Sequence, residues 1–269
     1  MTTPRILLFD SGMGGLTVAR AVSAQLPHAH LVYAGDNAGF PYGPWAEDAL
    51  TARIADVMGA LIAHVDPHIV VVACNTASTI ALSALRAKFA VPFVGTVPAI
   101  KPAGEQTKSG VIGVLATPGT VSRDYTHALI KTHASHCKVI LRGARRMAEM
   151  AEEKLKGQPV DLEELRQEIE PVYRKYQNKR TDIVVLGCTH YPLLVEDILK
   201  VAPWEVSYID PAPAIARRAA DILEKAPLHE ARLLVPAHGT VLLTTAGSDS
   251  LGAYARLGFP IPAILDMPV

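Results

Sequence analysis

Two short segments of this 269-residue chain place a cysteine in nearly the same sequence context. Residues 69–79 read IVVVACNTAST, and residues 183–193 read IVVLGCTHYPL. Each segment begins with an apolar, β-branched run that is typical of a strand buried on both faces. One small residue then leads to Cys74 or Cys188. Because open α/β sheets bind ligands at the carboxyl ends of their strands, the pattern predicts that both thiols lie in a ligand-binding site.

Several kinds of cysteine chemistry fit this spacing poorly. A structural zinc site takes ligands from local pairs such as Cys-x-x-Cys, and His190 beside Cys188 is too little for a metal site, so we expect no metal. Redox exchange requires a nearby resolving cysteine, which neither segment contains. A thiol hydrolase needs one cysteine with a histidine base, which Cys188 and His190 could supply, but it leaves Cys74 without a role.

A reaction that needs one proton carrier on each face of a carbon atom uses both cysteines alike. In racemisation, one thiolate removes the α-proton of an amino acid and the opposite thiol delivers a proton to the other face. A segment able to form a helix follows each cysteine, and a helix N-terminus lowers the pKa of a thiol. The simpler interpretation of either cysteine alone is a small buried core residue. No feature indicates a flavin, a nicotinamide or a pyridoxal-phosphate lysine, so we expect no cofactor.

Alternating strands and helices must position the two cysteines. Strands are predicted at residues 5–9, 31–34 and 91–94 and at the first cysteine run, and then again at 110–116, 138–141 and 206–209 and at the second cysteine run. We therefore predict an α/β fold of two similar α/β units, with mainly parallel sheets flanked by helices and the active site in the cleft between them. The first domain is expected to span residues 1–97 plus 208–269, and the second 98–207. A predicted helix at 212–225 packs back on the first unit.

Two glycine-containing segments follow predicted strands of the first unit. Residues 10–15 (DSGMGG) form a turn before a helix and could direct backbone N–H groups at an anion. The turn lacks the signatures of a phosphate loop or a dinucleotide site, so a carboxylate suits it better. Residues 35–43 (GDNAGFPYG) form a long loop at a strand end, where functional loops often lie. A tight turn and a surface loop without any ligand are the alternatives.

Composition narrows the class of protein further. The chain is 49% hydrophobic and has 26 basic and 26 acidic residues, so no net charge favours nucleic acid or a membrane surface. Only 6% of residues are aromatic, which argues against a stacking surface for single strands. Three widely spaced cysteines fit free thiols in a reducing compartment, and the N-terminus does not resemble a signal peptide. We predict a cytoplasmic protein.

The rest of the chain carries weaker signals. Residues 145–156 and 161–176 are predicted to be amphipathic helices with solvated charges. In the tail, residues 233–238, 240–245 and 257–261 resemble short strands, and the Pro-Ile-Pro sequence at 260–262 suits an edge strand or coil. Cys137 is expected to be buried and inert.

Four motifs in this order resemble the glutamate racemases of bacterial cell-wall synthesis. They are residues 9–15 (FDSGMGG), the loop from Asp36 to Pro41-Tyr42-Gly43, residues 73–78 (ACNTAS) and residues 187–194 (GCTHYPLL). The similarity extends over about residues 6–215. Any one motif alone would be a weak signal, whereas the four in order are specific.

The resemblance implies a cofactor-independent enzyme that converts L-glutamate to D-glutamate for peptidoglycan. It assigns the acid/base thiols to Cys74 and Cys188, and it gives Asp10 and His190 supporting catalytic roles. It assigns substrate binding to Asp10, Ser11, Tyr42, Gly43, Asn75, Thr76, Thr189 and His190. Hydroxyl, amide and N–H groups suit an α-carboxylate, and Asp10 suits an α-ammonium. The alternatives are a turn-forming role for Asp10 and a capping or packing role for His190.

One segment departs from the family pattern and leaves alternatives open. Residues 142–157 (RGARRMAEMAEEKLKG) are more charged than in many family members. The family's acidic residue would fall on Glu152, with Glu149 and Glu153 as rivals, and we assign none of them to catalysis. A racemase for aspartate or another acidic amino acid is one alternative, and a non-catalytic amino-acid-binding regulator is the other. The resemblance also suggests a homodimer.

Overall fold

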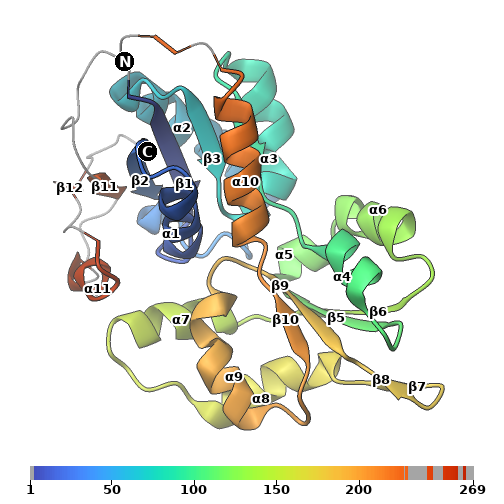
Figure 1. Ribbon diagram of the computed structural model, residues 1–269. Coiled ribbons are helices and arrows are strands. Elements are labelled where there is room, and N and C mark those ends of the chain that lie inside the picture. The colour runs from blue at the N-terminus through green and yellow to red at the C-terminus, as the bar shows by residue number, and fades with distance from the viewer. Residues whose placement is uncertain (1–2, 227, 230–240, 245–250, 260–262, 265–269) are drawn as a thin grey trace. The chain divides into compact units, whose positions relative to one another are not determined.

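The computed structural model describes residues 3–226, 228–229, 241–244, 251–259 and 263–264. Contacts between Cα atoms divide the chain into two compact units (Figure 1), with residues 1–96 and 212–269 in unit 1 and residues 97–211 in unit 2. We expected the return to the first unit after residue 207. It comes after residue 211 because strand β10 (Ser207–Ile209) pairs with β9 (Ile183–Gly187) in the sheet of unit 2.

Unit 1 is built on a six-stranded sheet in the order β12-β11-β2-β1-β3-β4. Every pair of neighbouring strands in it is parallel. The strands are β1 (Arg5–Asp10), β2 (His30–Gly35), β3 (Ile69–Val72), β4 (Phe93–Gly95), β11 (Val241–Thr244) and β12 (Ala263–Ile264). All residues of β1, β2 and β3 are buried, as expected for parallel strands covered on both faces.

Helices cover both faces of this sheet. On one face, α1 (Leu16–Gln25) packs against α10 (Ala212–Leu223), and α10 also contacts β3 and β4, which confirms the predicted return of that helix to the first unit. On the other face, α2 (Glu47–Val65) and α3 (Asn75–Lys88) enclose a core that includes Leu7, Phe9, Val70 and Val72. The 3-10 helix η1 (Asn37–Gly39) precedes α2, and α11 (Leu251–Arg256) lies in the tail.

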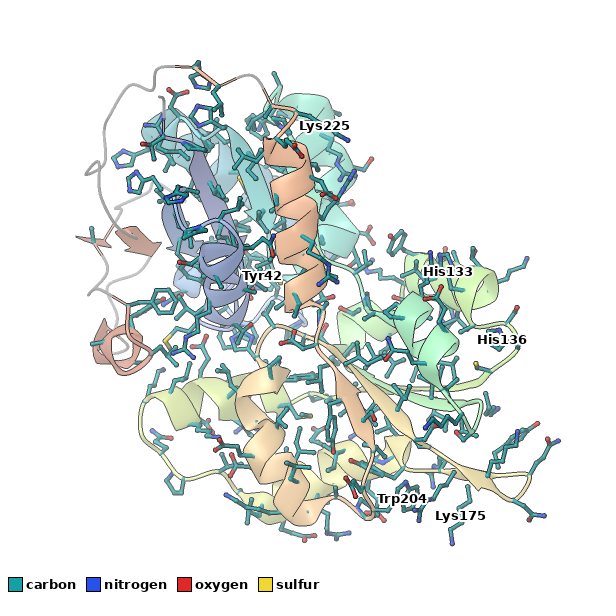
Figure 2. The ribbon with its side chains drawn as sticks, in the orientation of Figure 1. Tyr42, His133, His136, Lys175, Trp204 and Lys225 are labelled. Carbon is teal, nitrogen blue, oxygen red and sulfur yellow. The ribbon has the colours of Figure 1, made fainter. Side chains whose placement is uncertain are left out.

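Unit 2 is built on a four-stranded parallel sheet in the order β10-β9-β5-β6, with β5 at Val111–Ala116 and β6 at Lys138–Gly143. A core against this sheet includes Ile112, Val114 and Ala134. Side chains fill the space between sheet and helices in each unit (Figure 2). The helices of unit 2 are α4 (Ile100–Gln106), α5 (Pro118–Val121), α6 (Asp124–His133), α7 (Met147–Leu155), α8 (Leu162–Ile169), η2 (Glu170–Val172), η3 (Tyr191–Leu194) and α9 (Val195–Val201).

The two units repeat one strand order. In unit 1, β1 lies between β2 and the cysteine-bearing strand β3, and β4 lies beyond β3. In unit 2, β5 lies between β6 and the second cysteine-bearing strand β9, and β10 lies beyond β9. Each cysteine therefore follows the third strand, in chain order, of its unit's main sheet, next to the strand that opens that sheet. This arrangement confirms the predicted fold of two similar, mainly parallel α/β units.

One helix prediction was wrong. The helix expected at 161–176 ends at Ile169, because Pro171 cannot donate a helical hydrogen bond and the chain continues into η2 and the antiparallel hairpin of β7 (Lys175–Tyr176) and β8 (Lys179–Arg180).

Other predictions concern Cys137 and the tail. Cys137 is half-buried at the edge of the unit 2 core rather than fully buried, and burial raises the pKa of its thiol. Within residues 240–245, the expected strand is β11. Residues 233–238 and the Pro-Ile-Pro segment lie outside the described residues.

Candidate active site

Cys74 lies where β3 passes into α3. It is the N-cap residue of α3, and its Sγ accepts a hydrogen bond from the Ala77 N–H at 3.4 Å. The thiol also donates to the Ser11 hydroxyl, with Sγ and Oγ 3.8 Å apart. An N–H donor and the positive end of the α3 dipole both favour a negative charge on this sulfur. The local geometry therefore suits a thiolate.

Asp10 and Ser11 leave the sheet beside Cys74. The Ala73 N–H donates to the carbonyl of Phe9 at 2.8 Å, so β1 and β3 end together and bring Asp10 and Cys74 to one edge. The Asp10 side chain is fully buried, and its Oδ1 accepts the Gly12 N–H at 3.0 Å. A carboxylate buried at this edge can attract an ammonium group.

Asn75 and Thr76 form the first turn of α3 and are both buried. Neither the Oδ1 nor the Nδ2 of Asn75 has a hydrogen-bond partner among the described residues, although the side chain is only 2% exposed. Unpaired buried amides are rare because they lose hydration without compensation, and they mark places where a ligand is expected. The Asn75 amide can both donate to and accept from a bound amino acid.

The loop between β2 and α2 carries Tyr42 and Gly43. Tyr42, labelled in Figure 2, is buried in the same core as Cys74, and its hydroxyl donates to the Oδ2 of Asp36 at 2.6 Å. Burial raises the pKa of Tyr42 well above its usual value, and the negative charges of Asp36 and Cys74 raise it further. Tyr42 is therefore a neutral hydrogen-bonding group, while Gly43 is half-buried beside it.

Cys188 is the centre of a second cluster, in unit 2. Ala116 at the end of β5 pairs with Gly187 at the end of β9, so Cys188 follows at the edge of the sheet where β5 also ends. Its Sγ lies 3.8 Å from the Nδ1 of His190, and the Nε2 of His190 lies 3.0 Å from the Oε1 of Glu152. Thr189, which lies between Cys188 and His190 in the sequence, is buried. Thiol, imidazole and carboxylate thus form one hydrogen-bonded chain.

The charge state of His190 follows from this chain. Burial by itself lowers the pKa of the imidazole, but the hydrogen bonds to Cys188 and Glu152 outweigh it and raise the pKa well above its usual value. Both ring nitrogens of an imidazolium are donors, so His190 can donate to the Glu152 carboxylate and to the Cys188 sulfur together. The cluster therefore holds a positive charge beside Cys188.

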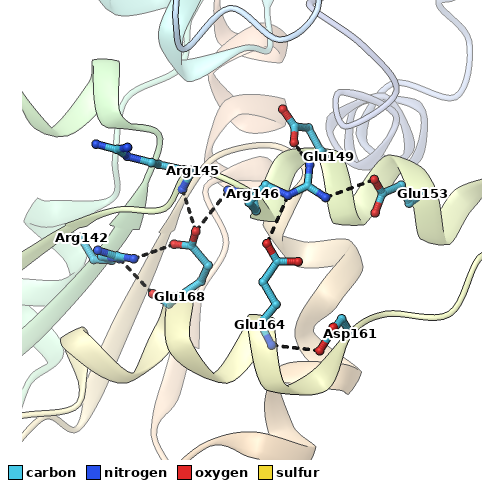
Figure 3. Close-up of polar contacts among 8 residues, drawn as sticks. All are labelled: Arg142, Arg145, Arg146, Glu149, Glu153, Asp161, Glu164 and Glu168. Atoms are coloured by element: carbon cyan, nitrogen blue, oxygen red, sulfur yellow. Dashed lines mark hydrogen bonds and ion pairs between the residues drawn. The ribbon is translucent and has the colours of Figure 1, made fainter.

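Glu152 and its two rival glutamates all lie on helix α7, but their surroundings differ. The Glu152 side chain is only 9% exposed and points at His190, whereas those of Glu149 and Glu153 are 31% and 40% exposed and pair with Arg146. Arg146 also pairs with Glu164 of α8 at 3.2 Å, so it ties two helices together (Figure 3). We left all three glutamates out of the catalytic set, and the structure brings Glu152 into the cluster. The sequence signal was the family resemblance, in which the acidic residue would fall on Glu152.

The sequence-predicted residues therefore fall into two clusters, one in each unit. Asp36 and Arg53, which support Tyr42, were not predicted from the sequence. In the part of the chain that the structure describes, no group of three or more histidine, cysteine or acidic side chains could hold a metal ion. None of the described helices combines the length and the apolar character needed to cross a membrane.

Comparison with known proteins identifies the class. The Asp/Glu/Hydantoin racemase family model matches residues 16–219. The glutamate racemase of Brucella anthropi is 53% identical over 220 residues, covering 81% of this chain and 79% of its own. The chain belongs to the Asp/Glu/Hydantoin racemase family. Within that family it groups with the glutamate racemases, enzymes that isomerise an amino acid.

Solved structures agree with this assignment. The crystal structure of Escherichia coli glutamate racemase in complex with L-glutamate and the activator UDP-MurNAc-Ala matches with a TM-score of 0.87 and 42% identity, covering 98% of both chains. The glutamate racemase isoform RacE1 from Bacillus anthracis matches with a TM-score of 0.82 and 29% identity over the full length of both chains. The α/β fold of two units is therefore that of solved glutamate racemases.

Proposed function

We propose that this enzyme interconverts L- and D-glutamate by a two-thiol acid–base mechanism with Cys74 and Cys188. The observation that carries the proposal is the repeated strand order, in which one cysteine follows the third strand of the main sheet of each unit. Each thiol also has its own supporting groups, Ser11 and the α3 N-terminus in one case and His190 with Glu152 in the other.

The reaction needs no external redox partner or cofactor. One thiolate takes the α-proton of glutamate and becomes a thiol, and the electron pair left on Cα is delocalised into the carboxylate. The opposite thiol then gives its proton to the other face of Cα and becomes a thiolate. The enzyme ends with the proton on the other sulfur, ready for the reverse reaction. A thiol suits this exchange because its pKa can be poised near neutral pH.

The remaining residues bind and polarise the substrate in this proposal. Asn75, Thr76 and the Tyr42–Gly43 segment hold the amino acid in unit 1, and Thr189 holds it in unit 2. Asp10 pairs with the α-ammonium, and His190 stabilises the thiolate of Cys188. The buried, unpartnered amide of Asn75 supports a binding role, since a ligand would supply its hydrogen bonds.

The test is α-proton exchange in deuterated water. Purified enzyme with a chelator and no added cofactor receives L-glutamate or L-aspartate, and deuterium at Cα and optical rotation are followed. We expect both signals with glutamate. Exchange with aspartate alone would change the substrate, and exchange with neither would favour a binding protein.

Cysteine variants test the two-thiol mechanism. Cys74→Ser and Cys188→Ser should each lower racemisation by about 10²- to 10⁴-fold, the usual contribution of a general acid or base. Cys137→Ser is the matched control and should keep the wild-type rate. A Cys74→Ser or Cys188→Ser enzyme that racemises at the wild-type rate would refute the mechanism.

The cellular role and assembly are part of the same proposal. D-glutamate made by the enzyme would supply peptidoglycan synthesis, which rescue of a bacterial strain that requires D-glutamate would test. A homodimer and a cytoplasmic location remain predictions, and analytical ultracentrifugation measures the first.

A further inference from the structure

Asp36 and Arg53 form a buried ion pair, and Asp36 also binds Tyr42. Asp36 follows β2, and its side chain is 0% exposed. The Nη2 of Arg53 donates to its Oδ1 at 2.6 Å, and the Nε of Arg53 donates to its Oδ2 at 2.7 Å. Arg53 comes from α2, and its side chain is 12% exposed. This bidentate geometry is the strong, direction-specific form of an arginine–carboxylate contact.

The same arginine also reaches the far end of the loop. The Arg53 guanidinium lies 5.6 Å from the centre of the Trp45 ring, and the indole N–H of Trp45 donates to the carbonyl of Gly39 at 3.0 Å. The Gly39 N–H in turn donates to the carbonyl of Asp36 at 3.0 Å. Arg53 therefore contacts the first and last residues of the 36–45 loop at once.

Close packing at Gly39 shows how tightly these groups meet. A Cβ atom at Gly39 would lie 2.5 Å from the Nε of Arg53, 2.6 Å from the Oδ2 of Asp36 and 2.9 Å from the Cε1 of Tyr42. Real Cβ contacts are essentially never this short, so a side chain at position 39 would displace Arg53, Asp36 or Tyr42. A loop held by such close contacts can present its backbone and side chains to a substrate at a reduced ordering cost.

Tyr42 connects the ion pair to the thiol. Its hydroxyl donates to the same Oδ2 of Asp36 that Arg53 binds, and its ring is packed in one core with Cys74. An ionised Cys74 acts on the Tyr42 hydroxyl, so the two groups are within electrostatic reach of each other. The physical chain from Arg53 through Asp36 and Tyr42 ends at the catalytic cysteine of unit 1.

We propose that Arg53 is a positioning residue for the racemase reaction: it neutralises Asp36 and holds Tyr42 and the 36–45 loop in the arrangement that binds the amino acid beside Cys74. This inference rests on the proposed function of Cys74 and of the Tyr42–Gly43 segment. Arg53 touches neither substrate nor thiol and acts through Asp36 and Tyr42.

Two physical consequences follow for a variant at this position. Arg53→Gln leaves the Asp36 charge buried without its guanidinium, so the loop loses its anchor and a negative charge remains near Cys74. Substrate binding should weaken, and the thiolate of Cys74 should become less favourable. Arg53→Lys keeps the positive charge but cannot form the bidentate contact, so it should recover only part of the binding.

The experiment measures binding, thiol reactivity and stability in parallel. For Arg53→Gln we expect KM for glutamate to rise about tenfold or more with a smaller change in kcat, because a displaced loop weakens binding first. Alkylation of Cys74 by iodoacetamide, followed by peptide mass spectrometry, should slow by roughly threefold or more at neutral pH, since a nearby unpaired carboxylate disfavours the thiolate. Protection of Cys74 by glutamate gives the binding constant independently of turnover.

Matched variants separate positioning from folding. Arg86→Gln is the control, because Arg86 lies in the same unit and donates to the Phe93 carbonyl at 3.0 Å. It should leave KM and Cys74 alkylation unchanged. Asp36→Asn removes the charge that Arg53 neutralises, and adding Arg53→Gln to it should change KM little further, because the two residues act as one unit.

The outcomes are distinct. A Tm that falls while KM and the alkylation rate stay at wild-type values would assign Arg53 a purely structural role and overturn the proposal. If Arg53→Gln does not fold, Arg53→Lys and Asp36→Asn carry the same test. A wild-type enzyme inactive on glutamate would refute the proposed function, whereas alkylation of Cys74 without substrate would still report the effect of Arg53.

Discussion

Replacing Glu152 by glutamine tests the hydrogen-bonded chain of Glu152, His190 and Cys188. The Oε1 of Glu152 lies 3.0 Å from the Nε2 of His190, and both side chains are buried. Glutamine keeps the size of the side chain and an oxygen that accepts a hydrogen bond, but it removes the negative charge. Glu152→Gln therefore isolates the electrostatic contribution of the carboxylate with little change in packing.

The magnitude follows from the kind of hydrogen bond that is lost. A hydrogen bond to a charged group contributes about 1.5–3 kcal/mol, and a neutral one about 0.5–1.5 kcal/mol, so the substitution costs on the order of 1–2 kcal/mol. Loss of that free energy lowers the pKa of His190 relative to the wild-type protein. If the imidazolium stabilises the Cys188 thiolate in the transition state, kcat/KM should fall by about five- to thirtyfold.

The pH dependence has a defined sign. The pKa of His190 in the folded protein is raised above its usual value by its hydrogen bonds to Cys188 and Glu152, despite burial. Its contribution to stability is therefore fully present below the unfolded pKa of about 6.5 and is lost as pH rises through the folded pKa. Glu152→Gln lowers the folded pKa, so the alkaline limb of kcat/KM should move to lower pH, and the loss of unfolding free energy should be largest near pH 6.

The assay is racemisation of both enantiomers across pH, together with urea unfolding. Since enantiomers interconvert with an equilibrium constant of one, kcat/KM must fall equally for L- and D-glutamate. Glu153→Gln is the control, because Glu153 lies on the same helix and pairs at 3.3 Å with the half-exposed Arg146. Such surface pairs contribute about 0–1 kcal/mol. Wild-type kcat/KM and an unshifted pH profile in Glu152→Gln would refute the role of the carboxylate.

Two further predictions concern unit 1. Asn75→Ala should raise KM for glutamate about tenfold and leave Tm nearly unchanged, since the buried amide has no hydrogen-bond partner among the described residues to lose. Initial rates of racemisation give KM and thermal unfolding gives Tm, and an unchanged KM would contradict a binding role. Gly15→Ala should lower the free energy of unfolding by about 1–3 kcal/mol. The new alanine Cβ would lie 2.6 Å from the Cβ of Asp10 and 2.9 Å from the hydroxyl of Tyr33. Wild-type stability of this variant in urea would contradict the prediction.

Strand prediction succeeded where the physical signal was local. The apolar runs before Cys74 and Cys188 are the buried strands β3 and β9, because strands covered on both faces need continuous β-branched sequences. The helix predicted at 161–176 failed at Pro171, where a single residue outweighs the amphipathic pattern around it. The boundary between the two units was placed after residue 207 rather than 211, because strand pairing depends on a partner 24 residues away, Ile183 opposite Ser207.

The sequence by itself determined which residues are candidates for the chemistry. The local pattern and the family resemblance indicate Cys74, Asn75, Cys188 and His190, because each of them lies just after the strand that positions it. Local order along the chain is enough for such residues, since the strand end that positions each one is its own neighbour in sequence.

Only the tertiary structure decided which distant groups support them. Glu152 reaches His190 across 38 residues of chain, and Arg53 reaches Asp36 across 17. In sequence, Glu152 is one of several glutamates on a charged helix, and Arg53 is one cation on an amphipathic one. Their partners are fixed by how α7 and α2 pack, because buried charges persist only where packing brings an opposite charge or a hydrogen bond within reach.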